Sequence, residues 1–226
     1  DAASGTTLDK LNNFARFVPR QALSLFLGKD RIFREILGVH GHIVECGVFY
    51  GGGLFTWAQL SAIYEPINHS RRIIGFDTFS GFPGVSRADR PAAKAQHKVR
   101  GGYRFSEIEE IEKSARLFDL NRPIGHIPKI ELVKGDARRT IPKYLRSNPH
   151  LVVAMLYLDF DLYEPTVTAL RAFLPRMPKG AVIAFDELNQ KQWPGETLAV
   201  LETASISGLK LRRFPFTPAI SYAVLE

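Results

Sequence analysis

Carboxylates follow two apolar runs of strand length in this sequence. Asp159 comes directly after the run at 152–158, and Asp186 and Glu187 come directly after the run at 181–185. Because neighbouring parallel strands end at the same edge of a sheet, we expect these three side chains to converge. No cysteine or histidine stands at ligand spacing beside them, and an oxygen-only ligand set is what a hard divalent ion such as Mg²⁺ prefers. The sequence therefore predicts a metal site made by Asp159, Asp186 and Glu187, with water and substrate completing the coordination.

A glycine-rich stretch follows the first strand-length run. The run at 42–46 contains Glu45 and leads into "GVFYGGG", which begins with Gly47 and includes Gly51. Such a loop has little side-chain bulk, so a ligand can lie against its backbone. It is not the dinucleotide fingerprint, because the interval from Gly47 to Gly51 is too wide and the charge of Glu45 would repel phosphate. This disfavours a nucleotide-binding oxidoreductase and leaves two interpretations: a site for a cationic, phosphate-free ligand, or only a tight turn.

Acidic residues also follow the second and third strand-length runs. Asp77 follows the run at 72–76, and Asp136 follows the run at 130–135. An acid at the end of the second strand can accept hydrogen bonds from both ribose hydroxyls of a nucleoside, and we expect Asp136 to accept one from an adenine amino group. Each acid can instead cap the following helix, which is the commoner role of a lone aspartate there. Together with Glu45, they predict a pocket for a nucleoside whose other end is positively charged.

The segment 78–105 is rich in glycine, proline and basic residues. Its basic residues outnumber its single acid, Asp89, and are Arg87, Arg90, Lys94, Lys98, Arg100 and Arg104. Glycine and proline break any helical period, so we expect a loop. It is either a solvated flexible loop or a lid over an anionic ligand. In the second case Arg100 and Arg104 would clamp a diphosphate or a uronate, with Lys98 adding a point charge.

Composition limits the class of protein further. The chain has 226 residues, 45% of them hydrophobic, with a net charge of +7 and one cysteine, Cys46. This is enough to bury one sizeable core, and it excludes an internal disulfide and a multi-cysteine metal cage. No membrane-spanning stretch or export signal is visible, so we expect a cytoplasmic protein without a membrane partner. Nucleic acid is not an expected partner either, because the aromatic residues of the basic segment lie at its ends and not between the charges.

Strand-length apolar runs alternate with helical patterns along the chain. The helical segments are 54–64, 106–118, 140–147, 164–177 and one near 195–204, and two short final runs, 209–214 and 220–225, can pair antiparallel. This alternation predicts an α/β fold with a doubly wound, mostly parallel sheet. Two helices, 8–18 and 20–37, are expected before the sheet. We therefore expect an N-terminal helical extension at 1–40, packed on a partner subunit or on its own sheet, and one main domain at 41–226.

Five segments of the sequence resemble the macrocin-type sugar O-methyltransferases, a branch of the class I S-adenosylmethionine-dependent methyltransferases. They are "VECGVFYGGG", "GFDTFSGFP", "VKGDARRTIP", "LYLDFDLYEPTVTALRAFLPRMPKGAVIAFDELN" and "RRFPFTPAISYAVL". The resemblance covers roughly residues 15–226 and is most specific from 151 to 189. It implies a Rossmann-like sheet of seven strands with the last one antiparallel. It also implies S-adenosylmethionine and Mg²⁺, or another divalent cation, as cofactors, and a homo-oligomer.

The resemblance also implies roles for individual residues. The cofactor-binding residues would be Glu45, Gly47, Gly51, Asp77, Thr78, Ser80, Gly135, Asp136 and Asp159, with Glu45, Gly47, Asp77 and Ser80 at the methionine and ribose and Gly135 and Asp136 near the adenine. Metal-dependent members have one acid after the fourth strand and two oxygen ligands after the fifth, which agrees with Asp159, Asp186 and Glu187. The last of these positions is often Asp in the family, and the longer Glu187 can shift the metal or fail to reach it.

The predicted reaction is methyl transfer to a hydroxyl of a sugar or a glycosylated small molecule. A hydroxyl is a poor nucleophile until its proton is removed, and a bound divalent ion lowers its pKa. The candidate catalytic residues are Asp159, Asp161 and His97, with Asp161 as base or substrate anchor and His126 as a rival base. Asp161 can instead be an acid at a helix N-terminus, and His97 only an exposed loop residue. Two further classes of protein stay open, a nucleic-acid methyltransferase and a module that binds the cofactor without catalysis.

Overall fold

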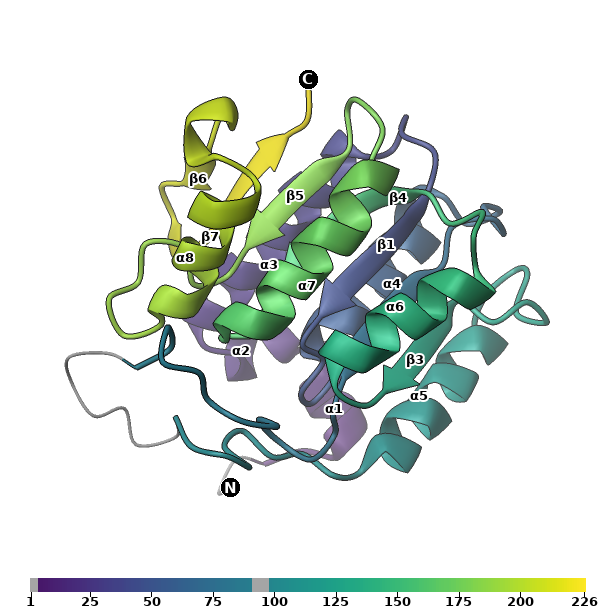
Figure 1. Ribbon diagram of the computed structural model, residues 1–226. Helices are drawn as coiled ribbons and strands as arrows, with labels where there is room; N and C mark the ends of the chain where they lie inside the picture. Colours follow the sequence, from purple (N-terminus) through teal and green to yellow (C-terminus); the bar gives the residue numbers. More distant parts are fainter. Residues whose placement is uncertain (1–3, 91–97) are drawn as a thin grey trace.

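The computed structural model describes residues 4–90 and 98–226, in which the strands form one seven-stranded sheet (Figure 1). The strands are β1 (His42–Cys46), β2 (Ile73–Asp77), β3 (Ile130–Lys134), β4 (Val153–Leu158), β5 (Val182–Phe185), β6 (Arg212–Phe214) and β7 (Thr217–Val224). Their order across the sheet is β3-β2-β1-β4-β5-β7-β6. Strands β1 to β5 run parallel, whereas β7 pairs antiparallel with both β5 and β6. The predicted α/β fold with an antiparallel last strand is confirmed.

Helices cover both faces of this sheet. The elements are α3 (Arg20–Glu35), α4 (Gly52–Tyr64) and α5 (Ile108–Leu120) on one face, α6 (Ala137–Ser147), α7 (Tyr163–Phe173) and α8 (Pro194–Thr203) on the other, and two 3-10 turns, η1 (Leu174–Arg176) and η2 (Ile206–Gly208). Each face has its own hydrophobic core, one around Trp57 and the other around Phe173. Because both faces are covered, every residue of β4 is buried, which explains why this strand is a continuous apolar run without alternation.

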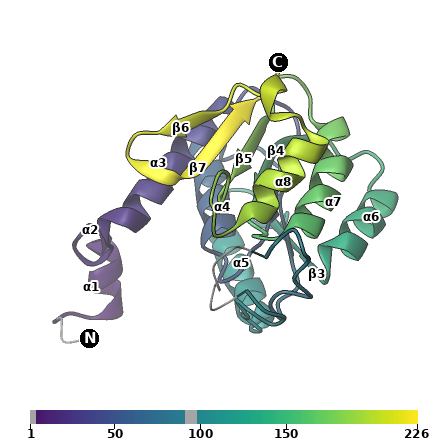
Figure 2. The ribbon, with the colours of Figure 1, turned by 60° about the vertical axis from the view of Figure 1, so that its left-hand side comes forward.

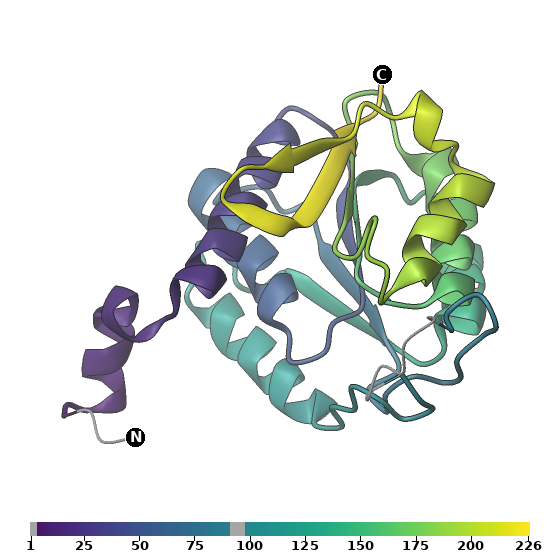
Figure 3. The same cartoon turned by 90° about the vertical axis from the view of Figure 1, so that its left-hand side faces the viewer.

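The N-terminal helices divide into a part that packs on the sheet and a part that does not. Helices α1 (Thr7–Asn12) and α2 (Phe14–Phe17) bury no residue and reach away from the body (Figures 2 and 3). Helix α3 packs on the sheet of its own chain, with Ile32 and Phe33 fully buried. The prediction of a single helix over 8–18 is therefore wrong, because the chain turns at Asn13 and forms two short helices.

The carboxyl ends of β1 to β5 meet at one edge of the sheet. The strand order reverses between β1 and β4, because the chain continues from β1 toward β2 on one side and from β4 toward β5 on the other. In open parallel sheets a ligand binds in the crevice at this point. The loops that follow these strands contain the acids and glycines identified in the sequence. None of the helices in the described ranges is long and apolar enough to cross a membrane.

Candidate active site

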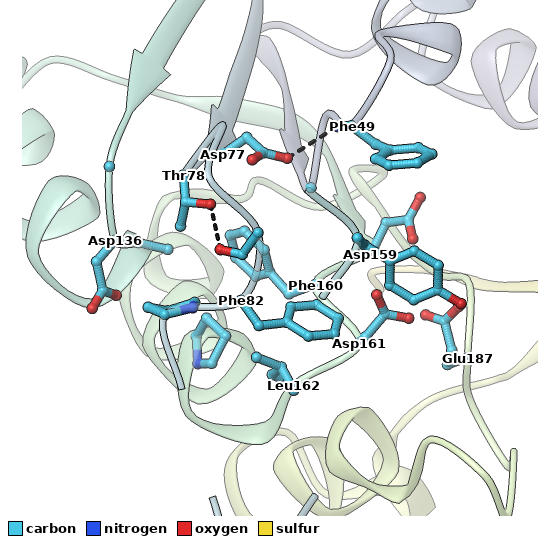
Figure 4. Close-up of a pocket in the computed structure, with 17 residues that line it drawn as sticks. Phe49, Asp77, Thr78, Phe82, Asp136, Asp159, Phe160, Asp161, Leu162 and Glu187 are labelled. Atoms are coloured by element: carbon cyan, nitrogen blue, oxygen red, sulfur yellow. Dashed lines mark hydrogen bonds between the residues drawn. The ribbon is translucent and has the colours of Figure 1, made fainter. Parts of the chain in front are cut away.

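A cavity of about 250 Å³ opens at the carboxyl edge of the sheet (Figure 4). The predicted site residues that line it are Gly47, Asp77, Thr78, Gly135, Asp136, Asp159, Asp161 and Glu187. Four others do not line it: Glu45, Gly51, Ser80 and Asp186. The remaining candidate, His97, lies outside the described residues. The cavity thus joins residues predicted for a nucleoside-type ligand to the acids predicted for a metal.

Gly47 lies where the backbones of β1 and β4 come together. Its N–H donates to the carbonyl of Phe76 at 2.9 Å, and the N–H of Asp159 donates to the carbonyl of Cys46 at 2.8 Å. The φ of Gly47 is 102°, a conformation that residues other than glycine rarely adopt. Gly51, in contrast, is the N-cap of α4 in a left-handed conformation and does not line the cavity. The tight-turn interpretation therefore accounts for Gly51, whereas Gly47 shapes the cavity.

Asp77 organises the loop that follows β1. Its Oδ2 accepts hydrogen bonds from the backbone N–H of Val48 at 2.8 Å and from that of Phe49 at 3.0 Å (Figure 4). Its Oδ1 accepts from the N–H of Phe79 at 2.7 Å. An ionised carboxylate has about four acceptor positions, so these three bonds leave capacity for one more donor. The sequence alone did not reveal this loop-holding role of Asp77.

Thr78 and Ser80 shape the start of the segment that follows β2. The hydroxyl of Thr78 donates to the carbonyl of Gly81 at 2.7 Å (Figure 4). It also accepts from the N–H of Ser80 at 3.1 Å. The side chain of Ser80 is exposed. These bonds fix the turn that brings Gly81 to the cavity wall.

Asp136 is the N-cap of α6. Its Oδ1 accepts from the backbone N–H of Arg138 at 3.0 Å and from the Nε of the same arginine at 2.9 Å. Arg138 also pairs with Glu164 of α7. The hydrogen bonds from the Arg138 side chain hold the pKa of Asp136 below its usual range. The Asp136 carboxylate therefore caps α6, the alternative role that the sequence allowed for it. Gly135 and Ala137 beside it line the cavity.

Glu45 is buried behind the cavity and not in its wall. Its side chain is 1% exposed, and the ammonium of Lys29, from α3, lies 4.0 Å from its Oε1. Gly53 makes room for it, because a Cβ at position 53 would stand 1.8 Å from that oxygen. Burial raises the pKa of Glu45 to about 8 against the opposing effect of Lys29. Its Oε2 has no hydrogen-bond partner among the described residues, so the carboxylate has acceptor capacity left for a cationic group.

Three carboxylates converge on one side of the cavity. Asp159, Asp161 and Glu187 each offer an oxygen, and these oxygens lie within 4.8 Å of one another (Figure 4). The Oε2 of Glu187 is buried without a partner in the described structure. The φ of Asp161 is 60°, a strained backbone conformation of the kind that clusters at functional sites.

Burial and mutual repulsion raise the pKa values of these carboxyl groups. Burial, followed by the charge of Asp186, raises the pKa of Asp161 to about 7 and that of Asp159 well above its usual value. Burial and then the charge of Asp161 raise the pKa of Glu187 to about 12. A divalent cation between them would relieve this repulsion and favour the ionised forms.

Asp186 lies beside this group and not within it. Its Oδ1 accepts a hydrogen bond from the hydroxyl of Tyr157 at 2.7 Å, which uses one of its two carboxylate oxygens. The acidic group of the described residues therefore contains Asp161 where the sequence predicted Asp186. The carboxylate of Asp186 still adds its charge to the environment of Asp159 and Asp161.

The described parts of the segment 78–105 form one wall of the cavity. Phe82 and Tyr103 line it, and Trp193, from the stretch before α8, lies against both rings at centroid distances of 5.9 Å. Of the predicted clamp residues, Arg100 and Arg104 are exposed and do not line the cavity. Lys98 is buried, and its Nζ donates to the carbonyl of Gln192 at 2.6 Å. Lys98 is therefore engaged with the protein and not presented to an anion.

His126 is excluded as a base by its position. It lies in the turn between α5 and β3, before the amino end of β3. Since the cavity is at the carboxyl end of that parallel strand, His126 is at the opposite edge of the sheet.

Sequence reasoning missed two features of the site. One is the apolar lining from Phe49, Phe160 and Leu162, of which Phe160 and Leu162 directly neighbour the predicted Asp161 in the sequence. The other is Glu196, a fully buried acid in the first turn of α8 whose Oε1 accepts from the N–H of Glu187 at 3.1 Å. An acid in the first turn of a helix is ordinarily a surface residue that interacts favourably with the helix dipole. Nothing in the sequence therefore indicated that Glu196 is buried.

The fold and the site together define a class. A mostly parallel seven-stranded sheet with an antiparallel last strand, carrying its cavity at the carboxyl ends of the central strands, is the architecture of the Rossmann-like class I methyltransferases. The sequence then identifies the family: residues 28–201 match the profile of the macrocin O-methyltransferase (TylF) family. The chain belongs to this family, and the predicted resemblance is confirmed.

Two curated relatives are similar to this chain over about two thirds of its length. One is 8-demethyl-8-(2,3-dimethoxy-alpha-L-rhamnosyl)-tetracenomycin-C 4'-O-methyltransferase of Streptomyces olivaceus, 29% identical over 66% of this chain and 54% of the relative. The other is demethyldecarbamoylnovobiocin O-methyltransferase of Streptomyces niveus, 26% identical over 68% of this chain and 55% of the relative. The chain spans about half the length of the relatives it matches.

The solved structures of CalS11 are similar over nearly the whole chain. The structure described as calicheamicin methyltransferase has a TM-score of 0.94 and 37% identity, covering 99% of this chain and 87% of CalS11. The apo structure, described as TDP-rhamnose 3'-O-methyltransferase, has a TM-score of 0.84 and 37% identity, covering 99% of this chain and 88% of the other.

Proposed function

We propose that this chain is an S-adenosylmethionine-dependent O-methyltransferase that methylates a hydroxyl of a sugar or a glycosylated small molecule, assisted by Mg²⁺ or another divalent cation. The observation that carries the proposal is that one cavity joins the wall of Gly47, Asp77 and Gly135 to the carboxylates of Asp159, Asp161 and Glu187. Membership of the macrocin O-methyltransferase family supports the reaction. The rhamnose units in the names of two similar proteins support a sugar as the acceptor.

The part of the cavity wall formed by Gly47, Asp77 and Gly135, here called the glycine wall, fits S-adenosylmethionine. Asp77 would accept from the ribose through the acceptor capacity that its three backbone bonds leave. Gly135 and Asp136 would border the adenine. The cationic methionine end would lie toward Gly47, with the unpartnered buried oxygen of Glu45 behind it as a hydrogen-bond acceptor.

The acidic group fits a hard divalent cation. Its donor set is oxygen only, one of its oxygens is buried without a partner, and its carboxyl groups repel one another. We assign Asp159, Glu187 and the nearby Asp186 as ligands, as the family arrangement implies. A bound divalent ion would lower the pKa of the acceptor hydroxyl and fix its orientation.

Asp161 is the proposed base. It would take the proton of the acceptor hydroxyl as that oxygen forms a bond to the methyl carbon and the bond from sulfur to methyl breaks, which leaves S-adenosylhomocysteine. Asp161 lines the cavity, and its carboxylate oxygen lies within 4.8 Å of those of Asp159 and Glu187, which places it beside the proposed metal. Phe82 and Tyr103 would hold the acceptor, and the exposed Arg100 and Arg104 stay predicted partners for an anionic part of it.

The N-terminal arm, α1 and α2, is proposed to pack against a second copy of the chain. Its apolar side chains are exposed, among them Leu8 at 65%, Leu11 at 65% and Phe14 at 54%. Several large apolar side chains exposed on two short helices suit an interface with another chain. Light scattering should give an assembly mass above that of the monomer, and Leu8→Glu with Leu11→Glu should lower it; a monomeric wild type would refute this part.

The cofactor assignment is tested by calorimetric titration of S-adenosylhomocysteine into the metal-stripped protein. We expect saturable binding that Asp77→Ala abolishes. Asp9→Ala is the matched control, because the Asp9 carboxylate also accepts a backbone N–H, that of Thr6, but at the start of α1 outside the cavity. No binding by the folded wild type would refute the methyltransferase assignment.

A further inference from the structure

The segment 78–105 is attached to the body by a buried carboxylate. Asp89 is 1% exposed, and its Oδ1 accepts the backbone N–H of Tyr163, the first residue of α7, at 2.6 Å. Its Oδ2 accepts from the backbone N–H of Ser86 at 2.9 Å and from the Ser86 hydroxyl at 2.6 Å. An acid of the loop therefore caps a helix that lies 74 positions further along the chain. This role lies outside the methyl-transfer chemistry assigned above.

The same carboxylate lies against the start of α8. A Cβ at Gly195 would stand 2.2 Å from the Oδ1 of Asp89, so the carboxylate fits only because position 195 has no side chain. Gly195 is in the first turn of α8. Helix N-termini carry partial positive charge, and Asp89 thus lies where two of them, α7 and α8, come together.

These two helix starts hold the acids of the cavity. Asp161 is two positions before Tyr163, in a strained conformation that its neighbours must maintain. Glu196, next to Gly195, accepts the backbone N–H of Glu187. Asp89 therefore contacts both backbone segments that determine where Asp161 and Glu187 point.

Lys98 provides a second attachment on the other described part of the segment. It is 9% exposed, its Nζ donates to the carbonyl of Gln192, and the same Nζ lies 4.1 Å from the centre of the Trp193 ring. Trp193 is the N-cap residue of α8. Both described parts of the segment, which contribute Phe82 and Tyr103 to the cavity wall, are thus attached at the start of α8.

We propose that Asp89 and Lys98 are positioning residues that couple the placement of the Phe82–Tyr103 wall to the alignment of Asp161 and Glu187. The inference rests on the proposed function, since it assigns these residues to the acceptor and metal side of that site. Asp89 acts through the backbone N–H of Tyr163 and the Ser86 turn, and it touches no reacting group. Loss of the attachment should therefore disturb metal binding and leave the cofactor side intact.

The test compares Asp89→Ala, Asp89→Asn and Lys98→Met, with Arg87→Ala as the control because Arg87 is an exposed residue of the same turn. Hydrogen exchange of the unliganded proteins is measured for peptides covering 78–90 and 159–166. The affinities for Mg²⁺ alone and for S-adenosylhomocysteine are measured by calorimetry. Exchange reports the attachment directly, and it does so whether or not the protein transfers methyl groups.

Asp89→Ala should accelerate exchange in both peptides roughly ten-fold or more, the size of effect expected from loss of a buried charge-assisted hydrogen bond. It should weaken Mg²⁺ binding roughly ten-fold, while S-adenosylhomocysteine binding changes less than about two-fold. Asp89→Asn keeps an acceptor for the Tyr163 N–H but loses the one for the Ser86 N–H. It should therefore restore exchange in 159–166 and Mg²⁺ binding more fully than exchange in 78–90. Lys98→Met keeps the apolar stem on Trp193 and should accelerate exchange in 78–90 more weakly, and Arg87→Ala should match the wild type.

Unchanged exchange in Asp89→Ala would overturn the proposal, as would equal losses of Mg²⁺ and S-adenosylhomocysteine affinity. If Asp89→Ala does not fold, Lys98→Met decides in its place, because faster exchange in 78–90 without weaker Mg²⁺ binding would contradict the coupling. A wild type that binds no S-adenosylhomocysteine would refute the proposed function and not the attachment, since exchange measures the latter independently.

Discussion

The backbone of Asp159 passes so close to Gly47 that a Cβ at position 47 would stand 1.9 Å from the Asp159 carbonyl oxygen. The two residues directly follow neighbouring strands, β1 and β4, and both line the cavity. The glycine wall and the acidic group are therefore joined through the backbone, and a change at one should be felt at the other.

Gly47→Ala should destabilise the protein by about 3 kcal/mol or more, since the new methyl group collides with backbone and the residue has positive φ. S-adenosylhomocysteine affinity should fall with it. Gly52→Ala is the matched control, because nothing lies within 4 Å of a Cβ there and alanine favours the helix by about 1 kcal/mol at most. Chemical denaturation with calorimetry checks both; equal stabilities of the two variants would contradict the steric argument.

Asp161→Asn and Asp186→Asn separate the roles of base and ligand. Because Asp161 is assigned to proton removal, Asp161→Asn should lower kcat about 100-fold or more with a smaller effect on the Mg²⁺ dissociation constant. Asp186→Asn should instead weaken Mg²⁺ binding by about ten-fold or more. Calorimetric Mg²⁺ titrations and initial rates at saturating Mg²⁺ measure the two effects. The reverse pattern would place Asp161 on the metal, as its closeness to Asp159 and Glu187 also allows.

Glu45→Gln should change how stability depends on pH. The native carboxyl, with its pKa raised to about 8 by burial, keeps a proton that the unfolded chain loses near pH 4.5. Its contribution to stability is therefore fully present below about pH 4.5 and is lost as the pH rises toward 8. Lys29 opposes the shift, whereas Asp186 and Asp77 add to it.

Glutamine has no proton to lose, so the free energy of unfolding of Glu45→Gln should fall less than that of the wild type between about pH 5 and pH 8, by an amount on the order of a few kcal/mol. Urea denaturation at several pH values gives both curves. Parallel curves for the two proteins would show that Glu45 is not protonated in the native state.

Phe82→Ala should weaken acceptor binding and spare the cofactor. The ring lines the cavity beside Trp193, and removal of a buried aromatic contact should raise the acceptor KM about ten-fold. Val99→Ala, an exposed change in the same segment, should have no effect. Acceptor KM and S-adenosylhomocysteine affinity are measured in parallel. A larger loss of cofactor than of acceptor affinity would assign this wall to the cofactor.

The sequence is informative about which residues reach the edge of the sheet, because a strand end is visible as the end of an apolar run. The positions of Asp77, Asp136 and Asp159 follow from that alone. What each side chain does there depends on its hydrogen-bond partners, which are distant in the chain for Asp77 and two positions away for Asp136. Asp77 holds the backbone of the loop after β1, and Asp136 is bound by Arg138 of its own helix.

Side-chain direction was harder to predict than position. Glu45 is within β1, where successive side chains point to opposite faces, and it lies against α4 and Lys29 and not in the cavity. Asp186 turns toward the hydroxyl of Tyr157, a hydrogen bond between adjacent strands that no spacing rule contains. The lone acid of the basic segment, Asp89, was visible in the sequence, but its partner Tyr163 belongs to an element that only the fold brings near.

The most direct test of the central claim is a mass-spectrometric assay of methyl transfer. The wild type is incubated with S-adenosylmethionine carrying a deuterated methyl group and with TDP-rhamnose and a panel of rhamnosylated compounds, in Mg²⁺ or in EDTA. If this chain is the proposed Mg²⁺-assisted O-methyltransferase, one labelled methyl group is expected on a sugar hydroxyl, lost in EDTA and restored by Mg²⁺. Binding of S-adenosylhomocysteine without transfer to any acceptor would contradict it and favour a non-catalytic cofactor-binding module.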